Sequence, residues 1–435
     1  MATKIVTKNS STAGSAPSAS DLVQGELAVN VVDKRLYTEN NSGAIVELGT
    51  NPAGAVTMAS TLAVTGNVDF NGDLDVDGTT NLDVVDVDGA VNFAADVTLA
   101  NGADLITASA GTSNFRAGVN AGNSIASGGN YNTVVGDEAG TAITTGDYNV
   151  AVGFDAGSEL TTGSENILIG GKAGDALTTA SGNLAIGRAS LTSDTLGSAS
   201  TAIGFQTLQN QNFTSATSTY NVAVGYQAGS SVTTGTSNTL IGGLAGDATT
   251  TGSNNTAVGS QSLGANTTGG SNVAVGLASL ATNTTASENT ALGFASLNLN
   301  TTGAGNTATG FFALAANTTG ANNVANGYKA LLSNTTASNN TAQGYFALAA
   351  NTTGASNVAV GYASLAGNTT ASNNTAVGHS ALNANTSGTQ NTAVGKGALD
   401  ANTTASNNSA FGYNALGSNT TGASNVALGQ FSLDA

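Results

Sequence analysis

The sequence predicts an all-β, elongated and fibrous fold, and three observations support this. A glycine recurs every 17 residues from Gly136 to Gly429 with one four-residue interruption. Fixed periods of this length with position-specific residue types are typical of solenoids, whose repeats pack only on their neighbours. Apolar residues alternate strictly in an Asp-rich middle segment, and a strand-and-turn pattern precedes it. We therefore expect a homotrimer with a small β-meander at 1–54, a short β shaft at 55–113 and a long β-roll solenoid at 114–435.

The first segment predicts three strands joined by two turns. Residues 25–38 read as a strand, a turn and a second strand, and a turn at 40–43 leads into a third strand at 44–48. Residues 10–20 are rich in Ser, Ala and Gly, so we expect this stretch to be flexible unless a partner orders it.

The second segment contains nine Asp and no Lys or Arg. Its short alternating strands have one dry and one wet face but little to pack against in one chain, so we expect several chains to share the core. Asp73, Asp75 and Asp77 match the first half of an EF-hand calcium loop, but its twelfth position is Val84 instead of Glu. We predict no metal and interpret these carboxylates as a solvated strand face. A looser site built from carboxylates of three chains is the alternative.

The third segment holds 19 coils. Asn stands four residues before the glycine in 18 coils, with Ser200 as the exception, and Leu stands four residues after it in the last eleven. Stacking would place each Asn above the next, so their amides can hydrogen-bond along the rod. Coils with Gly in place of Leu, such as the coil of Gly157, are expected to be narrower. The predicted structural ladder is represented by Asn255, Asn272, Asn289, Gly259, Gly276, Gly293, Leu263, Leu280 and Leu297.

Each coil also has two distinct strand faces. Asn, Ala and Gly fall on one side, whereas Thr or Val, Val or Ile and often an aromatic residue fall on the other. One side is expected to face the coil interior and the other a neighbouring protomer. At ~4.8 Å per rung the coils would span on the order of 90 Å. The repeated Asn-Thr-Thr triplets match glycosylation sequons, but we interpret them as hydrogen-bonded turns and ladders at the corners of the roll.

Two departures from the repeat are candidate functional positions. Thr309, Asn326 and Gln343 replace the usual Val before the glycine in three successive coils. They could form a buried polar layer that binds water or an ion at a protomer interface, but a neutral hydrogen-bonded layer or an outward-facing position is favoured. His379 takes the slot of Tyr362 in the preceding coil, and stacking in an aromatic row is favoured over catalysis.

Composition excludes several classes of function. Only 8% of the residues are charged and the net charge is −17, so we expect no nucleic acid and no anionic membrane as partner, because phosphate binding needs clustered Lys and Arg. The opening residues 1–6 lack a signal peptide's apolar stretch, and no run is long enough to insert in a membrane. The coils contain twelve acidic residues and one His, without the paired carboxylates that a glycosidase needs. We predict no catalytic residues and no cofactor.

Three stretches resemble parts of known fibrous proteins. Residues 24–30, 33–38 and 46–49 resemble the opening of tail-fibre and related virion fibre proteins of marine bacteriophages, and the Asp-rich stretch 72–78 is similar to phage fibre shafts. The Asn-x-Ala-Val-Gly rungs resemble the left-handed β-roll head of trimeric autotransporter adhesins, whose coils are usually shorter than these. An autotransporter would also need a signal peptide and a membrane anchor, so the phage interpretation is favoured.

The resemblance implies a homotrimeric fibre of a bacteriophage virion, synthesised in the host cytoplasm. Residues 1–54 would attach to other virion proteins, and the C-terminal end would meet a host surface receptor or a separate tip protein. The fibre would project from the particle for host attachment or as a spacer. Two alternatives stay open at this point: an adhesin whose roll surface directly binds host glycan or protein, and a head fibre attached to the capsid.

Overall fold

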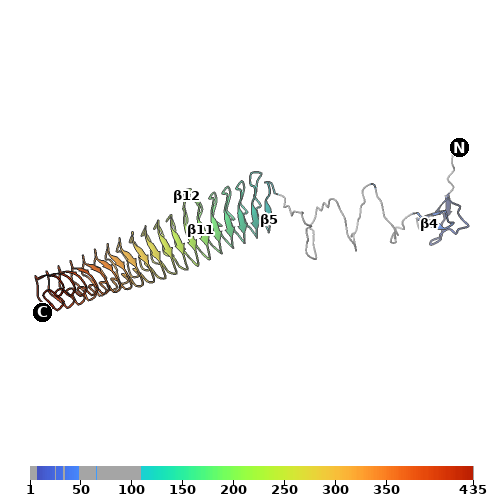
Figure 1. Ribbon diagram of the computed structural model, residues 1–435. Helices are drawn as coiled ribbons and strands as arrows, with labels where there is room; N and C mark the ends of the chain where they lie inside the picture. Colours follow the sequence, from blue (N-terminus) through green and yellow to red (C-terminus); the bar gives the residue numbers. More distant parts are fainter. Residues whose placement is uncertain (1–6, 25, 33–34, 49–64, 66–108, 435) are drawn as a thin grey trace. The chain divides into compact units, whose positions relative to one another are not determined.

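The computed structural model describes residues 7–24, 26–32, 35–48, 65 and 109–434. They belong to two units, one from the N-terminal part of the chain and one that follows residue 97. The predicted shaft with Asp73, Asp75 and Asp77 lies outside the described residues, apart from 65 and 109–113. Every described element is a strand (Figure 1). The all-β prediction is thus confirmed, and none of these residues lies in a helix that could cross a membrane.

The N-terminal unit is a four-stranded sheet in chain order. Its strands are β1 (Thr7–Ser10), β2 (Leu27–Asn30), β3 (Arg35–Glu39) and β4 (Ile45–Glu47). β2, β3 and β4 are antiparallel, as the turn signals predict, but β1 runs parallel to β2. β1 was not predicted, because its residues are polar and show no alternation of apolar and polar side chains. Buried Leu22, Ala28 and Tyr37 form the small core, with Ile45 packed against it.

The second unit is a solenoid of stacked, nearly identical coils (Figure 1). The 21 strands from β5 to β25, less β10 and β12, give 19 rungs, each with one three-residue strand. The rung strands are β5 (Phe115–Ala117), β6 (Thr133–Val135), β7 (Val150–Val152), β8 (Ile167–Ile169), β9 (Leu184–Ile186), β11 (Thr201–Ile203), β13 (Val222–Val224), β14 (Thr239–Ile241), β15 (Thr256–Val258), β16 (Val273–Val275), β17 (Thr290–Leu292), β18 (Thr307–Thr309), β19 (Val324–Asn326), β20 (Thr341–Gln343), β21 (Val358–Val360), β22 (Thr375–Val377), β23 (Thr392–Val394), β24 (Ser409–Phe411) and β25 (Val426–Leu428).

The rung strands pair in parallel and in register along the whole unit. Val273 of β16, for example, lies opposite Thr290 of β17, and Val275 lies opposite Leu292. A residue therefore sits beside its equivalent 17 positions later, and each column of the repeat becomes a row along the rod. We number these columns from the glycine that ends each strand, which is position 0.

The glycine at position 0 is required by both backbone angle and space. Gly276 has a φ of 132°, and a Cβ built on it would lie 2.5 Å from the carbonyl oxygen of Gly293 in the next rung. Residues with a side chain rarely adopt this φ, and the close approach of the next rung leaves no room for a side chain. The recurring glycine thus marks a bend at which the backbone of the next rung lies too close for a side chain.

The interior of the solenoid is filled in two alternative ways. Ala at position −2, such as Ala274, is buried in both. In the later coils Leu at position +4, such as Leu280, is fully buried. In coils with Gly at +4, such as that of Gly157, a buried residue at position +7 fills the space instead; it is apolar, as Leu160 is here, in all of these coils except that of Gly246, where it is Thr249. A Cβ on Gly157 would lie 2.6 Å from Leu168 Cδ1, so the expectation of a narrower coil missed the compensation from +7.

Candidate interaction surfaces and internal ladders

The Asn at position −4 forms a continuous buried ladder. The backbone N–H of Asn272 donates to Asn255 Oδ1 at 3.0 Å, and its Nδ2 donates to the same oxygen at 3.2 Å and to the carbonyl oxygen of Ala286 at 2.9 Å. The N–H of Asn289 in turn donates to Asn272 Oδ1 at 3.0 Å. Asn272 therefore joins its rung to both neighbours and also bonds across its own coil, whereas the buried Nδ2 of Asn289 has no hydrogen-bond partner. Buried amides with these partners contribute net stability and fix the axial stacking.

A second buried ladder lies at position +7. Asn283 Nδ2 donates to Asn266 Oδ1 of the preceding rung at 2.9 Å and to the carbonyl oxygen of Ala286 at 2.9 Å. The row continues to Asn419, and these are the Asn residues of the Asn-Thr-Thr triplets. Thr284 follows the pattern outside the core, because its Oγ1 donates to the carbonyl oxygen of Thr301 in the next rung at 3.1 Å. The triplets are thus ladder elements at the corners of the roll, as interpreted from the sequence.

The four-residue insertion, between Gly204 and Gly225, lies where the first ladder lacks an Asn and another side chain takes its place. Ser200 replaces Asn at −4, and Gln211 reaches into the gap: its Nε2 donates to Ser200 Oγ at 2.8 Å and its Oε1 accepts from Asn221 Nδ2 at 2.8 Å. The same Nε2 donates at 2.6 Å to the carboxylate of Asp194, which is fully buried. A short parallel pair, β10 (Gly197–Ser198) and β12 (Thr217–Ser218), covers this place. This role of Gln211 was not predicted from the sequence, because its partners are distant in the chain.

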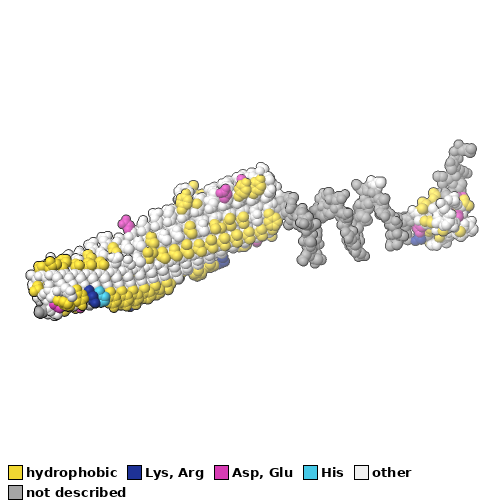
Figure 2. Space-filling model, in the orientation of Figure 1, with side chains coloured by type: hydrophobic (Ala, Val, Ile, Leu, Met, Phe, Trp, Pro, Cys, Tyr) yellow, Lys and Arg dark blue, Asp and Glu magenta, His cyan; other side chains and the backbone are white. Residues whose placement is uncertain are grey.

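The outward side chains of the strands form a face without charges. Positions −3 and −1 hold Thr, Ser, Val, Ile, Leu, Phe and Ala in nearly all rungs, and no charged residue in any. Figure 2 shows hydrophobic side chains in continuous bands along the rod, whereas charged side chains are few. Position −3 is Thr or Ser in ten rungs, whereas position −1 is apolar in all but three. Monomeric soluble proteins rarely expose an apolar row of this length, and such rows usually mark sites of protein association. We call these two rows the outer face.

Thr309, Asn326 and Gln343 lie on this outer face. They occupy position −1 in the adjacent strands β18, β19 and β20 and are opposite one another in register. Asn326 and Gln343 are exposed and Thr309 is half-buried. Within one chain they are therefore in outward-facing positions and do not form a buried layer.

An exposed aromatic ladder runs beside the outer face at position +1. The rings of Phe294, Phe311, Tyr328, Tyr345, Tyr362 and His379 stack from rung to rung with centroids 4.8–5.4 Å apart. His379 stacks on Tyr362 at 4.8 Å, as expected from its place in the repeat. The ring faces cover each other, so inside the ladder only ring edges meet solvent. Sugars that bind by stacking on an aromatic face have no open face there.

The charged residues of the rod are few and scattered. Lys172 forms ion pairs with Asp155 at 3.3 Å and Asp175 at 3.8 Å, all near the surface. Burial raises the pKa of Asp247, and the same cause raises that of Asp400, partly offset by the nearby His379. Among the residues that the structure describes, no three acidic, His or Cys side chains form a group suited to a metal ion.

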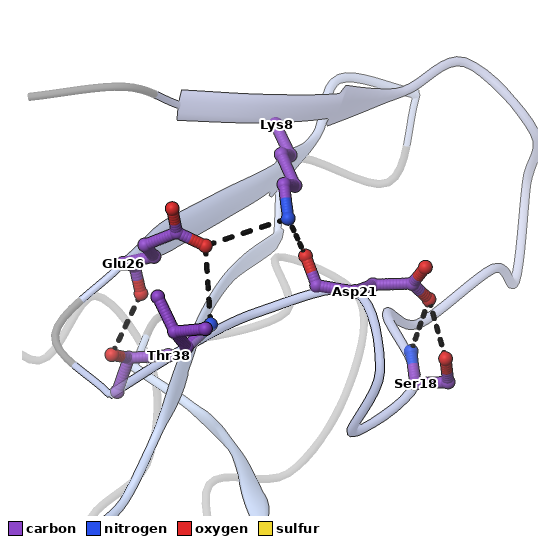
Figure 3. Close-up of polar contacts among 6 residues, drawn as sticks. Lys8, Ser18, Asp21, Glu26 and Thr38 are labelled. Atoms are coloured by element: carbon purple, nitrogen blue, oxygen red, sulfur yellow. Dashed lines mark hydrogen bonds and ion pairs between the residues drawn. The ribbon is translucent and has the colours of Figure 1, made fainter.

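The N-terminal unit is held together by polar contacts across its loop (Figure 3). Lys8 on β1 forms an ion pair with Glu26 at 3.4 Å and also donates to the carbonyl oxygen of Asp21. Asp21 Oδ2 accepts from the N–H of Ser18 at 2.7 Å and from its hydroxyl at 2.6 Å, which lowers the pKa of that carboxyl. Asn30 Nδ2 donates to two carbonyl oxygens of the 10–20 stretch. This stretch, expected to be flexible, therefore has defined contacts within the unit.

Comparisons with known proteins connect the chain to phage fibres. It is 37% identical over 75 residues to the long tail fiber protein Gp37 of Enterobacteria phage T2, which covers 17% of this chain and 5% of that protein. It is 45% identical over 49 residues to the long tail fiber protein Gp37 of Escherichia phage AR1, covering 11% of this chain and 4% of that protein. The matched segments thus span about a twentieth of the relatives' length. No family model and no solved structure matches. These matches and the β-solenoid fit a phage tail fibre, a structural component of the virion.

Proposed function

We propose that this chain forms the rod of a bacteriophage tail fibre that projects from the virion for host attachment or as a spacer. The observation that carries the proposal is the stack of 19 rungs, in which two buried Asn ladders join one rung to the next. At ~4.8 Å per rung the stack is on the order of 90 Å long. Such a solenoid sets a distance and presents a surface, and it requires neither a cofactor nor a catalytic group.

Electron microscopy of intact particles tests this proposal. An antibody raised against residues 1–54 should label the tail end of a thin projection, and one raised against the coils should label its shaft. Labelling on the capsid would instead support the head-fibre alternative. Absence of the chain from purified particles would contradict both.

We further propose that copies of the chain associate through the outer face, as a homotrimer. The support is the absence of charge from two rows that run through all rungs. The outer face holds 38 side chains, two per rung, so even ~25 Å² buried per side chain would give roughly 900 Å² per copy, comparable to a stable protein interface. Light scattering should return three times the mass of one 42.0 kDa chain. A monomer at every concentration would refute the association.

The two ends of the chain are proposed as attachment points. In the N-terminal unit Val23, Val31 and Leu48 are more than half exposed, which suits binding to another virion protein. A host receptor or a separate tip protein is proposed as the partner at the C-terminal end of the rod. Deleting residues 1–54 should prevent incorporation into particles without unfolding the coils, measured by immunoblot of purified particles.

A directly adhesive rod is the second candidate, since the aromatic ladder is exposed. Its weakness is geometric: the ladder offers ring edges, and both Asn ladders are buried, so the rows that would bind glycan are largely used internally. Particles in which Tyr328 and Tyr345 are replaced by Ser distinguish the two functions. Host adsorption should be unchanged for a spacer and strongly reduced for an adhesin.

A further inference from the structure

Row −1 of the outer face is interrupted by polar residues at one place along the rod. Position −1 is apolar in 16 of the 19 rungs and polar in three consecutive ones, at Thr309, Asn326 and Gln343. We propose that this polar stripe fixes the axial register and the parallel orientation in which copies of the chain pack on one another. The inference rests on the self-association proposed above and adds to it how the copies are aligned.

The side chains of the stripe are free to pair with another chain. Asn326 and Gln343 are exposed, and none of the three side chains makes a hydrogen bond to another described residue. An amide carries both donors and an acceptor, so like amides on two copies can bond each other reciprocally. The apolar neighbours on both sides, Leu292 and Val360, have no such capacity.

The repeat itself leaves the axial register weakly specified, because every rung presents an uncharged surface of similar size, with Thr, Ser or an apolar residue at position −3 and, outside the stripe, an apolar residue at position −1. A copy shifted by three rungs, or ~14 Å, would keep most of its apolar contacts. It would, however, place all three polar residues against apolar ones, where their lost water hydrogen bonds are not replaced. Single buried polar positions select register and strand orientation in coiled coils by the same means.

The stripe also distinguishes parallel from antiparallel packing. It occupies rungs 12 to 14 of 19, so it lies off centre. In an antiparallel pair with aligned ends, rung 13 would meet rung 7 and Asn326 would face Val224. Aligning the stripes in an antiparallel pair would leave six rungs of each copy unpaired. Only a parallel, unshifted arrangement pairs polar with polar and keeps every apolar rung covered.

The test measures register directly in the full-length chain. The protein contains no Cys, so the exposed Thr268, which lies away from the outer face, can be replaced by Cys and spin-labelled. Pulsed electron resonance then reports the distances between equivalent residues of neighbouring copies. The triple variant Thr309→Val, Asn326→Val, Gln343→Val should still associate, but its distance distribution should broaden at least about twofold, with added populations at longer distances that arise from axial shifts of whole rungs, ~5 Å each.

A matched control changes the same rungs and leaves the stripe intact. The double variant Thr307→Val, Thr341→Val alters position −3, where Val already occurs in other rungs such as that of Val358. It should give the same narrow distribution as the parent. A narrow distribution in the triple variant would overturn the inference, and so would a triple variant that is monomeric while the parent associates. A monomeric parent would instead refute the proposed self-association.

Discussion

Replacing Asn272 by Ala tests whether the buried amide ladder holds neighbouring rungs together. In the structure Asn272 Oδ1 accepts the backbone N–H of Asn289, and its Nδ2 donates to Asn255 and to the carbonyl oxygen of Ala286. The substitution leaves the N–H of Asn289 buried without a partner. The oxygen of Ala286 is less affected, because it also accepts from Asn283 at 2.9 Å.

The expected loss follows from these contacts. One orphaned buried N–H costs ~1–3 kcal/mol and each lost hydrogen bond about 1 kcal/mol, so a local destabilisation of ~3 kcal/mol is expected. At 1.4 kcal/mol per factor of ten, amides of the two adjoining rungs should exchange with solvent ~100-fold faster. The effect should fade within a few rungs, because a solenoid's contacts are between nearest neighbours.

Hydrogen exchange followed by mass spectrometry measures this loss rung by rung. Peptides around Asn272 and Asn289 should lose protection, whereas peptides beyond residue 340 should be unchanged. Thr268→Ala, in the coil that precedes Asn272 but on the surface, serves as the control and should leave exchange unaltered. A change of less than about threefold around Asn289 would refute the reasoning and would assign the cohesion of the rungs to apolar packing and backbone pairing.

Three further outcomes are expected. Gly276→Ala should lower the thermal midpoint measured by circular dichroism, because it adds strain of ~1–3 kcal/mol to a steric clash, while Gly243→Ala, in open space, should not. Leu280→Ala should cost ~2–5 kcal/mol in denaturant unfolding because Leu280 is fully buried, and a surface-like loss below 1 kcal/mol would contradict its core role. Burial raises the pKa of Asp247 in the folded chain, so the free energy of unfolding should fall as pH rises through and above 3.8. Asp247→Asn should remove that fall: the thermal midpoints of variant and parent should be equal at pH 3, and that of the variant should be higher at pH 7.

The repeat was readable from sequence because each column of residues has one fixed environment. Gly276 recurs because its backbone angle and the adjacent rung exclude a side chain, and Asn272 recurs because its side-chain amide bonds Asn255, Ala286 and the N–H of Asn289 at once. Both requirements are local to the coil and repeat with it. A period of 17 therefore predicted the rung, the strand and the ladder.

Features that depend on contacts between different columns were not predictable in this way. The exchange of core filling between position +4 and position +7 requires knowing that Gly157 and Leu160 share one interior space. Gln211 completes the ladder at Ser200 only because the coil folds back by eleven positions. Strand β1 forms through backbone pairing with β2, for which its polar side chains give no signal.

The constant register of the rung strands also bears on how such a rod changes length. Val273 lies opposite Thr290 just as Val358 lies opposite Thr375, so a rung covers its neighbour in the same way wherever it is added. Duplication or loss of a 17-residue unit in the gene would extend or shorten the rod in steps of ~5 Å and leave every row continuous. The four-residue insertion keeps the strand rows in register, but the ladder Asn is replaced by Ser200 there and Gln211 bridges the gap. The length of the rod can thus change in evolution by whole rungs, through recombination between its own repeats.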